Sequence, residues 1–327
     1  MAKQKPIFRC FQIEADYALM HSILMESTKA DQVVETATLD DVKIWCALSE
    51  RFDPKRDILF ALDDNGTEIG FSRVSWYTGK DDVKLYNQVS YLIPEYRKPG
   101  IWSEIVKENE LRLREIAAKH PYHQCFFQSW ATEIQKEWIA VLENEGFKAV
   151  RHFNNMLHSL EHIPECGLPD GIEVRPVRDD HYRKIWETQR EVQRELFEFV
   201  AEQWVDDSYQ TWSKNPSHTP YLWQIAWDGD QVVGMVLARI DKAENQALNR
   251  KRGYTEHVFV RKPWRQRGIA KALIARSLQE IKEQGMEEAE LGVDTENESG
   301  AYEFYRKMGY RTFSTDIWFR KPMELKG

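Results

Sequence analysis

Thr255-Glu-His-Val-Phe-Val-Arg-Lys-Pro-Trp-Arg-Gln-Arg-Gly-Ile-Ala-Lys-Ala-Leu-Ile-Ala-Arg276 is the stretch that decides how this chain folds. Residues 257–260 have β-branched side chains at alternate positions, which predicts a half-buried strand that ends before Pro263. From Gly268 to about Gly285 apolar residues recur at helical spacing. These residues are Ile269, Leu273, Ile274, Leu278 and Ile281. We therefore expect a strand, a short basic turn and an amphipathic helix.

The turn has the composition of an anion-binding site. Gly268 and Ala270 carry little or no side chain, so a ligand can approach the main chain closely. The first N–H groups of a helix lack internal partners, and the helix dipole adds partial positive charge there. Arg265 and Arg267 contribute full charges. The turn is therefore predicted to bind a pyrophosphate.

A second pattern lies further along the chain, with Asn297, Ala301, Tyr305 and the pair Gly309-Tyr310 in order. The turn, read as Arg/Gln-x-x-Gly-x-Gly/Ala between strand and helix, and this later pattern resemble the two signatures of the GCN5-related N-acetyltransferase (GNAT) superfamily. The resemblance implies an α/β (α+β) fold whose central sheet is mixed, mostly antiparallel and flanked by helices. It also implies an acyl-CoA-dependent N-acetyltransferase that uses acetyl-CoA.

The resemblance assigns residues to the coenzyme. The main chain of Val258, Phe259 and Val260 would pair with the pantetheine arm as if it were an added strand. Asn297 would contact the same arm. The pyrophosphate would be held by the residues of the turn, which are Arg265, Gln266, Arg267, Gly268, Ile269, Ala270 and Lys271.

Two catalytic roles follow from the chemistry. An alkyl ammonium has a pKa of about 10.4, so fewer than about one amine in a thousand is neutral at pH 7 and a base is needed. The departing thiolate needs a proton, and by resemblance Tyr305 is the candidate acid. Glu256, at the start of the strand, is the candidate base. His257 is its rival, with a pKa nearer neutrality, although strand alternation predicts that it faces the opposite side of the sheet.

The chain contains two copies of this unit, because glycine, turn and closing hydrophobic pair recur in the same order. The matching residues are Gly70 with Gly234, Arg97 with Arg265, Gly100 with Gly268, and Gly146-Phe147 with Gly309-Tyr310. Residues 164–171, rich in Pro and Gly, are predicted to be a linker between domains at 1–163 and 172–327. This layout is similar to that of the mycothiol synthases and other tandem GNAT proteins.

The first copy is predicted to be degenerate. Pro99 stands in the place of Arg267 and offers no N–H to a phosphate, and Trp102 stands in the place of Ala270. Leu142 lies opposite Tyr305, and Ile134 lies opposite Asn297. We therefore place catalysis in residues 172–327.

Composition narrows the partners. The net charge of −8 and the absence of a basic run argue against nucleic acid. No apolar run reaches the roughly 18 residues of a membrane helix, and the His and Cys spacings give no metal motif. A cytoplasmic protein is expected. The sequence leaves open whether the chain forms a homodimer.

The acceptor is expected between the two halves and under the helical, aromatic-rich segment from about Asp180 to Trp212. Acidic residues there would favour a cationic amine if they line the cavity, although their helical spacing also suits a solvated helix face. They are Glu187, Glu191, Glu195, Glu198 and Glu202. The principal hypothesis is transfer to the primary amine of a small molecule. The alternatives are a CoA-binding sensor or scaffold without turnover, and a protein or peptide N-acetyltransferase.

Overall fold

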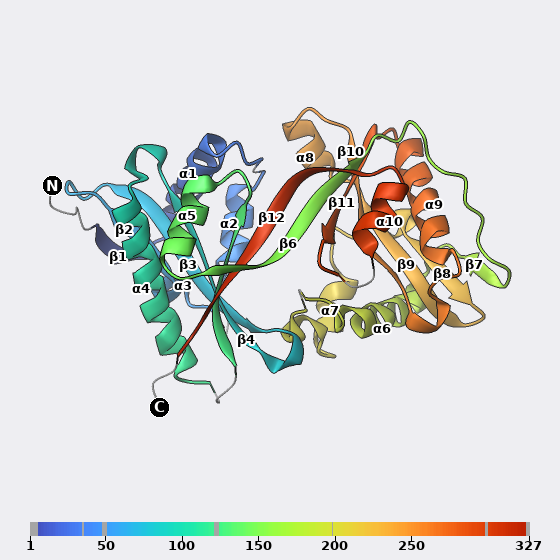
Figure 1. Ribbon diagram of the computed structural model, residues 1–327, viewed down its shortest axis with the longest axis horizontal. Coiled ribbons are helices and arrows are strands. Elements are labelled where there is room, and N and C mark those ends of the chain that lie inside the picture. Colours follow the sequence, from blue (N-terminus) through green and yellow to red (C-terminus); the bar gives the residue numbers. More distant parts are fainter. Residues whose placement is uncertain are drawn as a thin grey trace. The chain divides into compact units, whose positions relative to one another are not determined.

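The computed structural model describes residues 6–34, 36–47, 51–120, 124–197, 199–297 and 300–324, and Glu198 therefore lies outside the described residues. The chain forms two compact units. The first consists of Met1–His152 together with Asp316–Gly327, and the second is Phe153–Thr315. Figure 1 shows the strands and helices of each unit.

The first unit has a mixed sheet in the order β1-β2-β3-β4-β5-β12. Its strands are β1 Ile7–Cys10, β2 Ile58–Leu62, β3 Glu68–Thr78, β4 Lys84–Leu92, β5 Cys125–Thr132 and the later part of β12 Arg311–Pro322. Strands β4 and β5 run parallel, whereas the pairs β1/β2, β2/β3, β3/β4 and β12/β5 are antiparallel. A tight turn over residues 63–66 joins β2 and β3 as a hairpin, closed by the hydrogen bond from the Gly66 N–H to the Asp63 oxygen at 3.0 Å.

Helices cover both faces of this sheet. One face packs against α1 Ala15–Ala30 and α2 Leu39–Trp45, and α3 Pro54–Asp57 leads into β2. The other packs against α4 Pro99–Ala117 and α5 Lys136–Asn144. Most apolar side chains of α4 and α5 are buried there because both helices are amphipathic, and the rings of Trp102 and Trp138 are tilted against each other with centroids 4.8 Å apart.

The second unit repeats this arrangement in the order β7-β8-β9-β10-β11-β6. Its strands are β7 Ile172–Val174, β8 Gln224–Asp228, β9 Gln231–Arg239, β10 Arg252–Val260, β11 Glu288–Asp294 and the later part of β6 Lys148–His158. Strands β10 and β11 run parallel, and the pairs β7/β8, β8/β9, β9/β10 and β11/β6 are antiparallel. The predicted fold class, two units with mixed and mostly antiparallel sheets, is confirmed.

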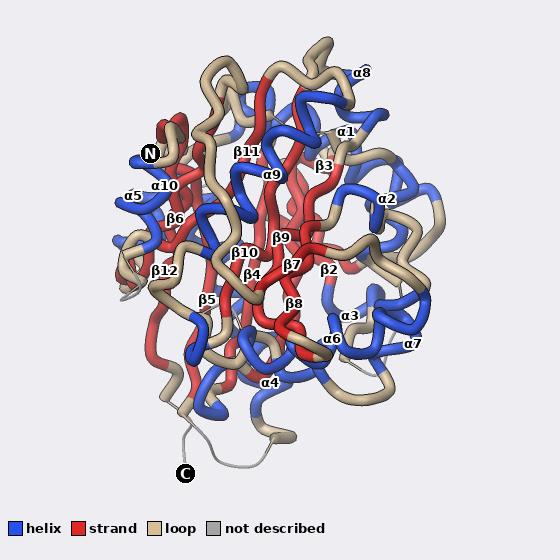
Figure 2. Tube along the Cα trace, turned by 90° about the vertical axis from the view of Figure 1, so that its right-hand side faces the viewer, coloured by secondary structure: helices blue, strands red, loops and turns tan. Residues whose placement is uncertain are grey.

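The predicted helix after Gly268 is confirmed as α9 Ile269–Glu283, whose five predicted apolar positions are all buried. It lies along β8, β9 and β10 (Figure 2). With α10 Ala301–Lys307 it covers one face of the sheet, and α6 Tyr182–Gln193 and α7 Ser208–Ser213 cover the other. Helix α8 Lys242–Ala247 precedes β10.

The expected long helical region from Asp180 to Trp212 is interrupted. Helix α6 ends at Gln193, a 3₁₀ turn covers Ala201–Trp204, and α7 follows. Glu195, just beyond α6, forms ion pairs with Lys262 and Arg265. These tertiary contacts hold the chain in a course that local helix propensity does not predict.

Each unit is completed by a strand from the other copy of the sequence. Residues 153–158 of β6 pair with β11, with Phe153 opposite Asp294 and His158 opposite Ala289. Residues 316–322 of β12 pair with β5. The compact units therefore differ from the domains at 1–163 and 172–327, because periodicity locates a strand but does not identify its partner.

Candidate active site

The candidate coenzyme slot is the place where β10 separates from β11. Residues Arg252–Tyr254 of β10 pair with residues Glu288–Glu290 of β11, and the parallel pairing ends there. Beyond Tyr254, β10 continues for six residues and remains paired with β9 on its other side. The main chain at Val258–Val260 therefore lies along the divergent part of β10, where an extended ligand can add as a strand.

A bulge shapes the same part of β10. Glu256 lies opposite Leu237 and Phe259 lies opposite Met235, so two residues of β10 face one residue of β9. His257 takes up the extra length with a φ of 48°. Bulges of this kind bend a strand and redirect its side chains, and this one lies beside the candidate catalytic residues.

The predicted pyrophosphate turn has an open main chain. Gln266 and Gly268 have φ values of 60° and 85°. The Gly268 oxygen accepts a hydrogen bond from the Ala272 N–H at 3.1 Å, at the start of α9. A Cβ placed on Gly268 would meet no atom within 4 Å, so space is free beside the N–H groups of the first helical turn. These residues fit a diphosphate.

Arg265 does not extend freely into this space. Its Nε donates to the carbonyl oxygen of Val260 at 2.9 Å, and its Nη2 lies 3.2 Å from the Glu195 carboxylate. This ion pair offsets part of the positive charge that Arg265 brings to the turn, and the contact of Arg265 with the pyrophosphate stays a prediction. Arg267 is exposed in the same turn and stays a candidate phosphate ligand.

The acidic residues after Asp180 serve mainly as partners for arginine and lysine. Glu187 pairs with Arg183, and Glu191 pairs with Arg261 at 2.9 Å. Glu195 bridges Lys262 and Arg265 at 3.0 and 3.2 Å. Partial burial of the Glu195 carboxylate would raise its pKa, but hydrogen bonds from Lys262 and Arg265 outweigh burial and hold the pKa of Glu195 below its usual range. These three carboxylates thus give no free negative wall for a cationic acceptor.

Tyr305 is buried in α10 among apolar side chains. Its ring lies edge-on to that of Tyr310 at 5.8 Å, and the Tyr310 hydroxyl shares a 2.8 Å hydrogen bond with Oγ1 of Thr255 on β10. Burial raises the pKa of Tyr305 well above its ordinary value, so the phenol keeps its proton at neutral pH. That protonation state is the one that a proton donor needs.

Asn297 lies in the turn between β11 and α10. Its main-chain N–H donates to Asp294 at 3.3 Å, and its carbonyl accepts from Gly300 at 3.2 Å. This turn follows the strand from which β10 separates. The contact between Asn297 and the pantetheine arm stays a prediction.

Glu256 and His257 lie on the same face of the sheet. Glu256 is opposite Leu237, which packs on the α6 face, and its carboxylate accepts from Arg239 Nε at 3.0 Å. His257 Nδ1 lies 3.2 Å from Nε2 of Gln193, the last residue of α6. The prediction of opposite faces is wrong because the bulge interrupts alternation. No sequence signal distinguished Arg239 or Gln193.

His257 keeps part of its surface in contact with solvent, but many protein atoms lie around its ring. These neighbours desolvate the imidazole and so lower the pKa of His257, whereas the nearby Glu256 carboxylate opposes the shift. The imidazole is therefore neutral at pH 7. The two rivals for the base differ in their partners, since the Glu256 carboxylate is held by Arg239 and the His257 ring contacts Gln193.

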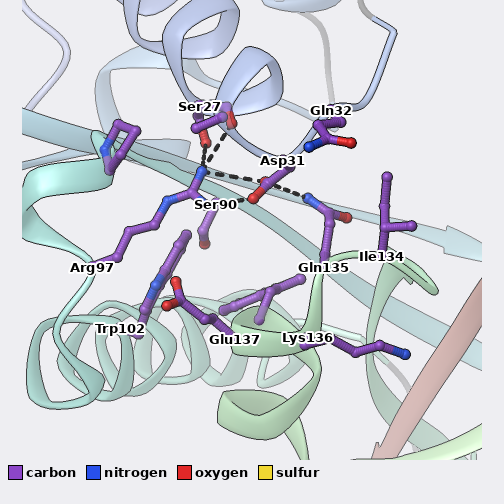
Figure 3. A pocket seen from close by; sticks show the side chains of 13 residues that line it. Ser27, Asp31, Gln32, Ser90, Arg97, Trp102, Ile134, Gln135, Lys136 and Glu137 are labelled. Carbon is purple, nitrogen blue, oxygen red and sulfur yellow. Dashed lines mark hydrogen bonds and ion pairs between the residues drawn. The ribbon is translucent and has the colours of Figure 1, made fainter.

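The first unit has a cavity of about 480 Å³ at the corresponding place, beside Ser90, Arg97 and Trp102 (Figure 3). Strands β4 and β5 pair only from Lys84–Asn87 to Cys125–Gln128 and then separate. The Trp102 side chain is buried beside the cavity, where the second unit has Ala270. The loss of diphosphate binding in the first copy stays a prediction.

Comparisons with known proteins agree with this geometry. Residues 183–310 match the acetyltransferase (GNAT) family. The chain is 21% identical over 271 residues to a mycothiol acetyltransferase of Geodermatophilus obscurus, covering 81% of this chain and 82% of that protein. It is 33% identical over 86 residues to N-alpha-acetyltransferase 30 of Schizosaccharomyces pombe, covering 26% of this chain and 55% of that protein.

A solved structure shows the same fold over the whole length. A GCN5-related N-acetyltransferase from Sphaerobacter thermophilus superposes with a TM-score of 0.71 at 22% identity, covering 98% of this chain and 96% of that one. Among the helices that the structure describes, none is both long enough and apolar enough to span a bilayer. The slot and the turn both lie within residues 183–310, the part of the chain that matches the acetyltransferase (GNAT) family.

Proposed function

We propose that this protein transfers an acetyl group from acetyl-CoA to the primary amine of a small molecule, by direct attack of the amine on the thioester. The observation that carries the proposal is the divergence of β10 from β11 immediately before a turn with an open main chain. An extended, diphosphate-bearing thioester matches both features, since its arm can add to β10 while its diphosphate meets the N–H groups of α9.

The candidate acid and base approach β10 from opposite faces. Tyr305 and its neighbour Tyr310 belong to the apolar cluster around α9 and α10, whereas Glu256 faces the α6 side. The Tyr305 phenol would donate its proton to the departing thiolate. Glu256 would take the proton of the attacking ammonium, directly or through water, which offsets a barrier of about 4–5 kcal/mol at pH 7.

The α6 face offers hydrogen-bond acceptors to an amine. Gln189 lies one helical turn before Gln193, and its Oε1 is buried without a partner in the described structure. A buried carbonyl oxygen without a donor is costly, so an N–H group of a ligand would be favoured there. This unpaired oxygen supports binding of the substrate amine, which accepts the acetyl group, between α6 and the bulge of β10.

A second candidate is N-acetylation of a peptide. The local match to N-alpha-acetyltransferase 30 favours it, although the chain spans about half of that relative. Binding of the coenzyme without any transfer is the third outcome to be tested.

Thiol release from acetyl-CoA, measured across a panel of small amines and peptides, distinguishes these functions. We expect saturable turnover with at least one small primary amine. Turnover restricted to peptide amino termini would establish the second candidate, and tight CoA binding with no turnover on either panel would establish a sensor. Absence of CoA binding would overturn the proposal.

A further inference from the structure

The end of α6 is tied to the coenzyme turn by two carboxylates. Glu191 binds Arg261, with Oε2 to Nη2 at 2.9 Å and Oε1 to Nε at 3.1 Å. Glu195 binds Lys262 and Arg265 on the two sides of its carboxylate. Arg265 in turn reaches the carbonyl oxygen of Val260, the last residue of β10. A chain of charged contacts thus runs from α6 through the turn to the strand.

The first unit contains the same device. Arg97 Nε donates to the carbonyl oxygen of Leu92, the last residue of β4, at 3.2 Å. Its guanidinium pairs with Asp31, just after α1, and also donates to the oxygen and Oγ of Ser27 (Figure 3). Gln135 Nε2 donates to the same Asp31 carboxylate at 2.9 Å. Arg97 and Asp31 therefore play the parts of Arg265 and Glu195.

The first copy indicates the role of this arginine–carboxylate pair. There Pro99 offers no N–H and Trp102 is buried beside the turn, so the arginine is retained in a copy that is predicted not to hold a diphosphate. An arginine that serves only to bind phosphate would have no role in that copy. Its common role in both copies is to join the end of a strand to the residues at the end of an earlier helix, α1 in the first copy and α6 in the second.

The two copies differ in how closed the ion pair is. The Arg97 and Asp31 side chains are 11% and 14% exposed, whereas those of Arg265 and Glu195 are 39% and 35% exposed. In the second unit the pair lies at the surface beside the open main chain of the turn. It can therefore hold the turn without filling the space that the diphosphate needs.

We infer that Glu195 is a positioning residue for the coenzyme: it orients Arg265 onto the Val260 carbonyl and thereby holds the turn from Gln266 to Lys271 in its phosphate-binding form. The inference rests on the proposed function. The same segment carries Gln193, which contacts His257 at the bulge. Glu195 thus links the strand, the turn and the acceptor side of the site.

The direction in which Glu195→Gln changes the affinity for CoA distinguishes a positioning role from simple electrostatic repulsion. A carboxylate near a diphosphate site repels the ligand, so simple electrostatics predicts that Glu195→Gln binds CoA more tightly. The positioning role predicts the opposite, a dissociation constant raised by about 2- to 5-fold, the upper part of the range expected for ion pairs at the surface. Glu195→Asp retains the charge and should recover part of the affinity.

Isothermal titration of CoA into the full-length wild type and the variants Glu195→Gln, Glu195→Asp and Glu187→Gln is the experiment. Glu187 is on the same helix but pairs with Arg183, so its neutralisation should leave CoA affinity within twofold of wild type. Thermal unfolding checks that all variants are folded. Unchanged or tighter binding by Glu195→Gln overturns the inference while leaving the proposed function intact. Failure of the wild type to bind CoA overturns both.

Discussion

The hydroxyl of Tyr310 and the Oγ1 of Thr255 share a hydrogen bond of 2.8 Å. Thr255 lies on β10 one residue before Glu256, and Tyr310 packs against the ring of Tyr305. The bond therefore fixes the segment after α10 against the strand that carries the candidate base. Because neighbouring residues of a strand point to opposite faces, it places Tyr305 and Glu256 on opposite faces of β10.

Tyr305→Phe tests the proton donor. The substitution keeps the buried ring and removes only the hydroxyl, so we expect CoA affinity to remain within a factor of about two. We expect kcat to fall by about 10²- to 10⁴-fold, the usual contribution of a positioned acid. Steady-state kinetics with an amine substrate and a CoA titration measure both values. Full turnover would remove the donor role from Tyr305 and leave the rest of the proposal standing.

Glu256→Gln tests the base against its rival. We expect kcat/KM at pH 7 to fall by at least about 10²-fold, with a smaller loss for His257→Gln. Arg239→Gln serves as the matched control for the ion pair, because it frees the Glu256 carboxylate without removing it. A larger loss from His257→Gln than from Glu256→Gln would transfer the role to the histidine.

Gly268→Ala tests the open main chain of the turn. The Cβ of an alanine there would have free space, but the residue would have to adopt a φ of 85°, which costs an L-residue about 1–2 kcal/mol. We expect reduced stability in chemical denaturation and weaker CoA binding. Gly167→Ala, also in open space but without a positive φ, is the control and should change neither quantity. Wild-type CoA affinity in Gly268→Ala would contradict close approach of the ligand at this residue.

Phe319→Ala tests the exchange of strands. Phe319 lies on β12 opposite Ser129 of β5 and is fully buried in the apolar core of the first unit. Truncation should destabilise that unit by about 3–5 kcal/mol, seen as faster amide hydrogen exchange in β5. Phe313→Ala is the control on the same strand, because its side chain is exposed and little stability should be lost. Unchanged exchange in β5 would argue against the observed pairing.

His158 predicts a loss of stability in mild acid. Burial lowers its pKa in the folded protein, although a main-chain hydrogen bond to Met308 opposes the shift. Below about pH 6.5 the unfolded chain therefore binds a proton more readily than the folded one, and the free energy of unfolding falls as pH decreases. Denaturation at pH 7.5 and pH 5.5 should show this fall, and His158→Gln should make it shallower. Equal slopes for the two proteins would exclude the contribution of His158.

The sequence by itself determined the elements around Gly268 and the internal repeat, and it predicts the loss of the first diphosphate site. It could do so because helical spacing, glycine at a positive φ and proline without an N–H are local constraints. The tertiary structure decided the partners: β12 with β5, β6 with β11, Glu195 with Arg265, and His257 on the face of Glu256. Those outcomes depend on contacts between residues far apart in the chain and on one extra residue in a strand, and local patterns carry no information about either.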